Sequence, residues 1–283
     1  MDEAFRRFAE LCPDAVIVTD RQGVIEDVNP ACERLTGYAR DELVGRTPAL
    51  LKSGLHEADF YRGLWTALLA GEEVRAVFCN RRKDGALFYE DKIVRPLQGG
   101  FVSFGRDVTA RSLEREKLAH AATHDSLTEL PNRSLYLDRL GQALRHAARR
   151  GEALAIGIMD IDQFRATNNR FGHAAGDAVL QAVAQRTLDC VRQSDTVARI
   201  GGDEFALLLG ITGEQALAPV LQKIVAANGA PVPFEGRSLP VSVSIGACAY
   251  PQCGGSEIQL LKQADALMYQ AKHAGGGRYA LAV

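Results

Sequence analysis

The chain has 283 residues, 47% hydrophobic and 24% charged, which is typical of a soluble globular protein and long enough for two modest domains. Its formal net charge of -2 gives no general attraction to phosphate backbones or anionic lipid, so nucleic acid is not expected as a partner. The six cysteines form no Cys-x-x-Cys pair, and no apolar run approaches the roughly 20 residues of a membrane helix, so we expect a cytoplasmic chain without a membrane segment.

Residues 12–107 contain two β-rich runs, a helical region between Pro30 and Gly71, and three further β-rich runs. Lys83-Asp84-Gly85 between two of the later runs is a hairpin signal. The expected strands are 15–20, 24–28, 74–80, 87–96 and 101–107. Local strings resemble those of a PAS domain: Thr19-Asp20-x-x-Gly23, Val28-Asn29-Pro30, Leu35-Thr36-Gly37-Tyr38 and Arg106-Asp107-Val108-Thr109. The resemblance implies that this domain has an antiparallel sheet with helices and that it acts as a sensor.

Three aromatic residues of this first domain, Phe60, Tyr61 and Trp65, are expected to pack in its core. A flavin or haem pocket is the alternative, with His56 as the candidate haem ligand. A single histidine near a helix start is far more often a surface residue. The ligand of the PAS domain therefore stays unknown from the sequence.

Residues 108–124 are rich in charge and contain neither proline nor glycine, which predicts a helix that joins the two domains. Leu113 and Leu118 are among its few apolar residues. They cover too few turns to establish a coiled coil.

From Asp125 onward helices and strands alternate. Gly201-Gly202 lies between two β-rich runs, and we expect it to supply the positive φ angles of a tight two-residue turn. The expected helices are 135–149, 177–191, one from Glu214 and one from Ser256; the expected strands are 154–159, 196–200, 204–209 and 241–247. This α+β order, βαββαβ, predicts a ferredoxin-like or polymerase-palm-like sheet that contains antiparallel strands and has helices on one face.

Acidic residues follow two of these strands. Asp160 and Asp162 come at the end of the run 154–159, and Asp203 and Glu204 lie at the tip of the hairpin. If the strands are neighbours, these carboxylates form a hard oxygen site suited to magnesium. Taken separately, each pair could also be an ordinary turn with exposed acids.

Six strings in order resemble the GGDEF family of diguanylate cyclases over about residues 125–279. They are His124-Asp125-Ser126-Leu127-Thr128, Asp160-x-Asp162-x-Phe164-x-x-x-Asn168, Phe171-Gly172-His173-x-x-Gly176-Asp177, Arg199-x-Gly201-Gly202-Asp203-Glu204-Phe205, Ser244-Ile245-Gly246 and Ala264-Asp265-x-x-Met268-Tyr269-x-Ala271-Lys272.

This resemblance implies a role for each matching residue. Asp160 and Asp203 would bind the metal through their side chains and Ile161 through its carbonyl. Glu204 would be the acidic partner of the reacting 3′-hydroxyl, and Lys272 would neutralise the distal phosphates. The remaining implied GTP-binding residues are Asn168 and Asp177, which would read guanine, and Phe164, Arg165, Gly201 and Gly202.

Arg192 and Asp195 match the R-x-x-D pattern of the family's inhibitory product site, ahead of Gly201. An arginine there can hold a guanine or a phosphate in a bidentate manner. A solvent-facing pair at a helix end is the alternative, because this pattern also arises by chance.

The resemblances together imply a PAS sensor domain over 1–107, a helical linker over 108–124 and a GGDEF domain over 125–283. The implied activity is condensation of two GTP into cyclic di-GMP and two pyrophosphates, with Mg²⁺ or alternatively Mn²⁺, by a homodimer that its product inhibits. The alternative is a non-catalytic receptor for GTP or cyclic di-GMP, or a dimerisation module.

Overall fold

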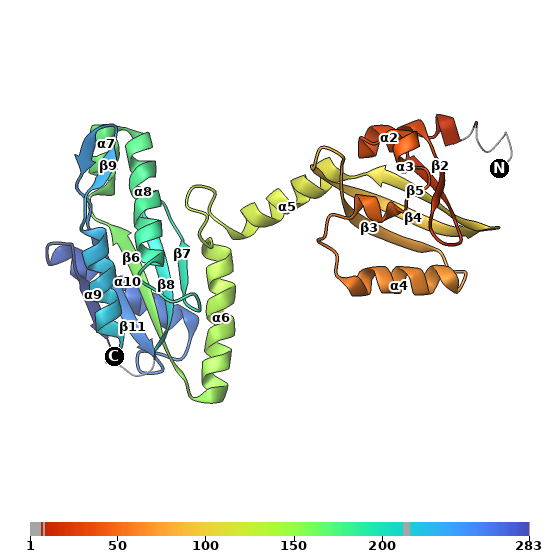
Figure 1. Ribbon diagram of the computed structural model, residues 1–283. Helices are drawn as coiled ribbons and strands as arrows, with labels where there is room; N and C mark the ends of the chain where they lie inside the picture. Colours follow the sequence, from red (N-terminus) through yellow and green to blue (C-terminus); the bar gives the residue numbers. More distant parts are fainter. Residues whose placement is uncertain (1–6, 8, 212–215, 283) are drawn as a thin grey trace. The chain divides into compact units, whose positions relative to one another are not determined.

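The structure of the chain is a computed structural model that describes residues 7, 9–211 and 216–282 (Figure 1). The chain divides into two compact units, one ending at Lys117 and the other beginning at Leu118. Each unit contains its own five-stranded sheet. Among the described residues, no helix is both long and apolar enough to cross a membrane.

The sheet of the first unit has the order β2-β1-β5-β4-β3, and all its neighbouring strands are antiparallel. Short helices connect β2 to β3, as the PAS resemblance predicts. The strands are β1 (Ala15–Asp20), β2 (Ile25–Val28), β3 (Val74–Arg81), β4 (Leu87–Leu97) and β5 (Gly100–Asp107), and the helices are α2 (Pro30–Thr36), α3 (Arg40–Leu43), the 3-10 helix Pro48–Leu51 and α4 (Ala58–Leu69).

Asn29 fixes the start of helix α2. Its Oδ1 accepts hydrogen bonds from the backbone N–H groups of Cys32 and Val16, both at 2.9 Å, so one side chain caps the helix and attaches it to β1. Pro30 follows at the first helical position, where its missing N–H costs nothing. The string Val28-Asn29-Pro30 therefore determines where strand β2 ends and helix α2 begins.

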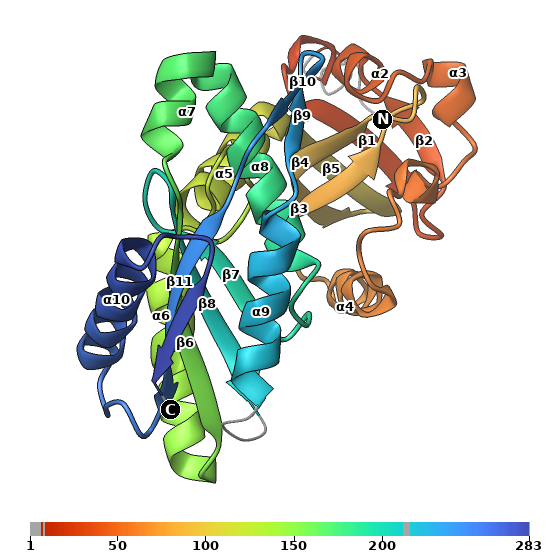
Figure 2. The ribbon, with the colours of Figure 1, turned by 90° about the vertical axis from the view of Figure 1, so that its left-hand side faces the viewer.

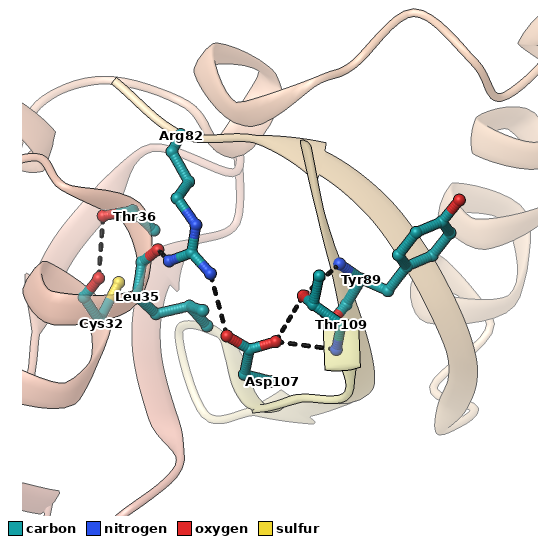
Figure 3. Close-up of polar contacts among 7 residues, drawn as sticks. All are labelled: Cys32, Leu35, Thr36, Arg82, Tyr89, Asp107 and Thr109. Carbon is teal, nitrogen blue, oxygen red and sulfur yellow. Dashed lines mark hydrogen bonds and ion pairs between the residues drawn. The ribbon is translucent and has the colours of Figure 1, made fainter. Parts of the chain in front are cut away.

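A polar network around Asp107 stabilises the C-terminal end of β5, the last strand of the first sheet (Figure 3). Asp107 accepts hydrogen bonds from the backbone and hydroxyl of Thr109 and forms an ion pair with Arg82 at 2.9 Å. Arg82 also donates to the carbonyl of Leu35 at the end of α2. Burial acts to raise the pKa of Asp107, but these hydrogen bonds outweigh it and hold the pKa below its ordinary value. The network thus fixes the residue at which helix α5 (Thr109–Thr123) begins.

The second sheet has the order β12-β11-β6-β8-β7. All its pairs are antiparallel except β11 with β12. The strands are β6 (Ala153–Ile161), β7 (Thr196–Arg199), β8 (Glu204–Ile211), β11 (Val243–Tyr250) and β12 (Tyr279–Ala282); β9 (Val232–Phe234) and β10 (Arg237–Leu239) form a separate hairpin.

Helices cover both faces of this second sheet, so the expectation of helices on one face is wrong (Figure 2). Helices α8 (His173–Leu188) and α9 (Leu217–Asn228) pack on one face, and α6 (Arg133–Arg150) and α10 (Glu257–His273) pack on the other. The reason lies in the strands: consecutive residues 205–209 of β8 and 243–249 of β11 are buried, without the alternation of a one-sided sheet. The expected helix start at Glu214 lies outside the described residues. Ser256 caps α10 as predicted, since its side chain accepts from the N–H of Gln259.

Candidate functional site

Strand β6 lies between β8 and β11, and this position gathers the acidic residues. In the register of the sheet, Asp160 is opposite Glu204 of β8 on one side and Ser244 of β11 on the other. The N–H of Ile161 donates to the carbonyl of Asp203 at 3.3 Å. The condition for a shared acidic site, that the two acid-bearing strands are neighbours, is therefore met.

Asp160 is the buried member of this cluster, with 5% of its surface exposed. Burial raises the pKa of its carboxyl to about 6, and the nearby charges of Asp203 and Glu204 add to the increase. Lys272 Nζ lies 2.6 Å from Asp160 Oδ1 and opposes this increase. Lys272 is thus the partner of a carboxylate oxygen that has no other polar contact among the described residues.

This arrangement fits a divalent cation that is completed by substrate oxygens. No group of three His, Cys, Asp or Glu side chains could hold a metal within the described part of the chain. Magnesium, however, is commonly held by one or two carboxylates together with substrate phosphates and water. The buried Asp160 and the adjacent Asp203 supply such carboxylates, and the only contact of Asp160 Oδ1 within the described chain is with Lys272, which a cation could replace. Ile161, the next residue of β6, offers a backbone carbonyl.

Asp162 does not belong to this acidic cluster, contrary to the expectation from its spacing. It follows the end of β6, and its Oδ2 accepts from Ser242 Oγ at 2.6 Å and from the N–H of Gly277 at 2.8 Å. Its Oδ1 accepts from Ser244 Oγ at 2.7 Å. Asp162 therefore anchors the glycine-rich segment that follows helix α10, and its oxygens are already occupied.

The hairpin between β7 and β8 differs from the expected two-residue turn. Ile200–Asp203 separate the two strands, and neither Gly201 nor Gly202 has a positive φ. A Cβ at Gly201 would lie 2.7 Å from Glu204 Oε2, whereas a Cβ at Gly202 would meet nothing within 4 Å. A side chain at 201 would therefore displace the Glu204 carboxylate from its present position, whereas position 202 has room for one.

Arg199 holds this turn in place, a role that the sequence did not reveal. Its Nε and Nη2 donate to the carbonyl of Gly202 at 3.2 and 2.7 Å, and its Nη1 donates to Asp125 Oδ1 at 2.9 Å. Asp125 also accepts from the backbone and hydroxyl of Thr128. Burial acts to raise the pKa of Asp125, but the hydrogen bonds from Thr128 and Arg199 hold it below its ordinary value. Arg199 therefore links Asp125, near the start of the second domain, to the turn that carries Asp203.

Helices α7 (Phe164–Phe171) and α8 bring Asn168 and Asp177 near each other. Asn168 Oδ1 is buried and has no hydrogen-bond partner among the described residues. A Cβ at Gly176, next to Asp177, would lie 1.9 Å from that oxygen and 3.2 Å from the ring of Phe164. Glycine at 176 therefore permits the close contact that presents an unused polar atom of Asn168.

Free backbone N–H groups follow strand β6, at the start of α7. Gln163 precedes this helix in a left-handed conformation with φ 55°, an uncommon angle for a residue with a side chain. The first N–H groups of a helix have no intrahelical acceptor and can hold an anion. Arg165 is exposed on the same first turn. Lys272 and these amides are thus the chain's candidates for holding phosphates.

Arg192 and Asp195 lie apart from this acidic cluster, before strand β7. Asp195 accepts from the N–H of Arg192 at 2.9 Å and from the N–H of Gly210 at 3.0 Å, so its carboxylate stabilises the local turn. The side chain of Arg192 is exposed. Beside Asp195 is an open cleft that is also lined by Arg139 and Arg145 of α6.

Comparison with known proteins identifies relatives of both domains. The family described as "Diguanylate cyclase, GGDEF domain" matches residues 122–278, and the family described as "PAS fold" matches residues 3–108. An uncharacterised signalling protein of Caulobacter vibrioides is 34% identical over 98% of this chain and 34% of its own length. Diguanylate cyclase TpbB of Pseudomonas aeruginosa is 44% identical over 60% of this chain and 39% of its own length.

The second domain also resembles a solved structure. A truncated form of TpbB that comprises only its GGDEF domain matches with a TM-score of 0.55 and 42% identity, over 56% of this chain and 94% of that one. The chain spans little more than a third of the length of the two curated relatives.

Proposed function

The chain belongs to the GGDEF family of diguanylate cyclases and carries a PAS domain before its GGDEF domain, and from this premise we propose that it condenses two GTP molecules into cyclic di-GMP with release of two pyrophosphates. The observation that carries this proposal is the register of β6, which sets the buried Asp160 beside Asp203 and Glu204, with Lys272 in place of a cation. All three acids of the family's catalytic motif are present.

Each acid has a separate task in this proposal. Asp160, Asp203 and the carbonyl of Ile161 would hold a divalent cation, which would neutralise charge on the triphosphate. Glu204, which lies on β8 opposite Asp160, would accept the proton of the attacking 3′-hydroxyl. Lys272 would leave its ion pair with Asp160 and bind the outer phosphates, together with the first amides of α7.

Asn168 and Asp177 would select guanine over adenine. Guanine offers an N–H and an amino group to these oxygens, and its carbonyl can accept from the amide of Asn168. Adenine would leave a buried polar atom unpaired at a cost of about 1–3 kcal/mol. The unsatisfied Oδ1 of Asn168 supports this assignment.

Condensation of two nucleotides requires two copies of the GGDEF domain to face each other, because each copy has one such site. We therefore propose a homodimer. Helix α5 would transmit the state of the PAS domain, since the Asp107 network fixes the residue where this helix begins. Arg192, with Asp195 maintaining its turn, would bind cyclic di-GMP as an inhibitor.

The test is incubation of the purified chain with GTP and Mg²⁺, followed by chromatography of the products. We expect cyclic di-GMP from the parent chain and from Asp138→Ala, which removes an exposed acid on α6, but none from Asp203→Ala or Glu204→Gln. Binding of GTP without any product in the parent would instead support a receptor. Arg192→Ala should leave the initial rate unchanged and raise the final yield of product.

A further inference from the structure

The PAS domain contains a cavity of about 240 Å³ between its sheet and helix α4. Aromatic and aliphatic side chains form most of its walls, including Trp65, Phe78 and Phe101. Pockets for drug-sized ligands usually have volumes of about 300–1,000 Å³. A ligand that fits this cavity is therefore small and largely apolar.

The polar residues of the cavity wall carry an excess of positive charge and of hydrogen-bond donors. Lys52 and Lys92 both line it, and no aspartate or glutamate of the described ranges does. The side chain of Lys92 is 7% exposed, and its Nζ lies 2.9 Å from Oε2 of Glu90, which is outside the wall. An ammonium group has three N–H donors, so this ion pair leaves two of them for a ligand.

Two further groups in the wall lack an anionic partner. The hydroxyl of Tyr61 is buried and makes no hydrogen bond among the described residues. Lys52 Nζ lies 3.8 Å from the centre of the Tyr61 ring, and no carboxylate within the described ranges pairs with it. Lys52 is exposed, whereas the Tyr61 hydroxyl is a buried donor that an acceptor would stabilise. A carboxylate is the strongest acceptor that a small organic ligand offers, and it could also pair with the Lys52 ammonium.

The surroundings of the cavity argue against the larger cofactors considered from the sequence. His56 Nε2 accepts a hydrogen bond from the N–H of Cys79 at 2.8 Å, and its ring stacks on Phe60 at 4.2 Å. His56 is thus occupied by the protein and does not line the cavity. Among the described residues, no histidine lines the cavity to ligate a haem.

We propose that this cavity binds a small carboxylic acid with an apolar chain or ring. The carboxylate lies between Lys92 and Lys52 and accepts from the hydroxyl of Tyr61. The apolar part packs among Trp65, Phe78 and Phe101. The site is distinct from the GGDEF centre, and its occupancy can be measured without cyclase activity.

Trp65 provides a built-in reporter, because it lines the cavity and is the single tryptophan of the chain. Its ring centre lies 5.7 Å from that of Phe101 in an edge-on contact. The full chain is titrated with hexanoate and phenylacetate while its tryptophan fluorescence is recorded, and the amides of the same two acids serve as uncharged controls. We expect saturable changes with the acids, at least about tenfold tighter than with the amides. Equal affinity for the amides, or no saturable change with either acid, would overturn the proposal.

Substitutions of the two lysines separate charge recognition from apolar burial. Lys52→Met keeps an unbranched side chain and should weaken hexanoate binding about tenfold, without changing the weak binding of the amide. Removing Lys92 alone would leave Glu90 buried and unpaired, so the double change Glu90→Gln with Lys92→Gln is used instead. Lys83→Met, which removes a surface lysine paired with Glu42, is the control and should bind like the parent. Unchanged hexanoate affinity in Lys52→Met and in the double variant would refute recognition of the carboxylate; if the double variant does not fold, Lys52→Met decides alone.

Discussion

Replacing Asp160 by asparagine should stabilise the metal-free GGDEF domain at neutral pH while it abolishes cyclase activity. Asp160 is 5% exposed, and its burial, with the charges of Asp203 and Glu204, raises its pKa from 3.8 to about 6. One pKa unit corresponds to about 1.36 kcal/mol. A rise of about two units therefore means that ionised Asp160 costs the folded domain about 3 kcal/mol relative to the unfolded chain.

The sign of the pH dependence follows from the direction of this shift. Because the pKa of Asp160 is raised by folding, the folded domain holds the proton more tightly than the unfolded chain does. Below about pH 3.8 the carboxyl is protonated in both states, and its burial carries no ionic cost. Between pH 3.8 and about 6 the unfolded chain ionises first, so stability falls, and above that range the cost is constant. Asparagine does not ionise and avoids this loss.

Differential scanning calorimetry in the presence of a chelator measures the effect. We expect Asp160→Asn to unfold several degrees above the parent at pH 7.5, with the difference shrinking as the pH falls toward 4. Added Mg²⁺ and GTP should then stabilise the parent but not the variant. Asp138→Asn, on the exposed surface of α6, should match the parent throughout. A difference that is the same at pH 4 and pH 7.5, or a variant less stable than the parent at pH 7.5, would refute this reasoning.

Three further substitutions test the supports of the site. Arg199→Met should lower kcat about tenfold with a smaller change in KM, because it frees the carbonyl of Gly202; steady-state kinetics that show only a KM effect would contradict this. Gly176→Ala should weaken GTP binding at least about tenfold in calorimetric titration, since its methyl group would lie 1.9 Å from Asn168 Oδ1; parent-like affinity would argue against a role for that oxygen. Gly246→Ala should destabilise the domain by about 3 kcal/mol or more in denaturant unfolding, because its Cβ would lie 2.0 Å from a backbone nitrogen of α10, whereas Gly202→Ala should unfold like the parent.

Features encoded by short local signals could be predicted from the sequence. Asn29-Pro30 and Ser256 mark helix starts, because each cap bonds an N–H three residues further along the chain, and both helices begin there. The acidic residues at the ends of two strands suggested a shared site if those strands were neighbours, and the pairing of Asp160 with Glu204 meets that condition. Family strings then supplied the roles that spacing alone leaves open.

Features that depend on distant contacts could not be predicted. Asp160 and Asp162 are two residues apart, which suggests a shared direction, but β6 ends at Ile161 and Asp162 turns toward Ser242. The bond between Arg199 and Asp125 joins residues 74 positions apart and leaves no periodic trace in the sequence. The sequence allows two explanations for glycine at 201: a positive φ angle in the turn, or room for a neighbouring side chain. The φ angle is not positive, and a Cβ at 201 would contact Glu204, so the structure supports the second explanation.

The central position of β6 makes the acidic centre part of the most protected region of its domain. Partners on both sides satisfy the backbone of this strand, so its amide protons should exchange with solvent mainly through global opening of the domain. Fraying at the edge strands β7 and β12 would leave Asp160 in place. The centre should therefore persist for as long as the domain itself, and regulation would have to act on how two such centres meet rather than on their assembly.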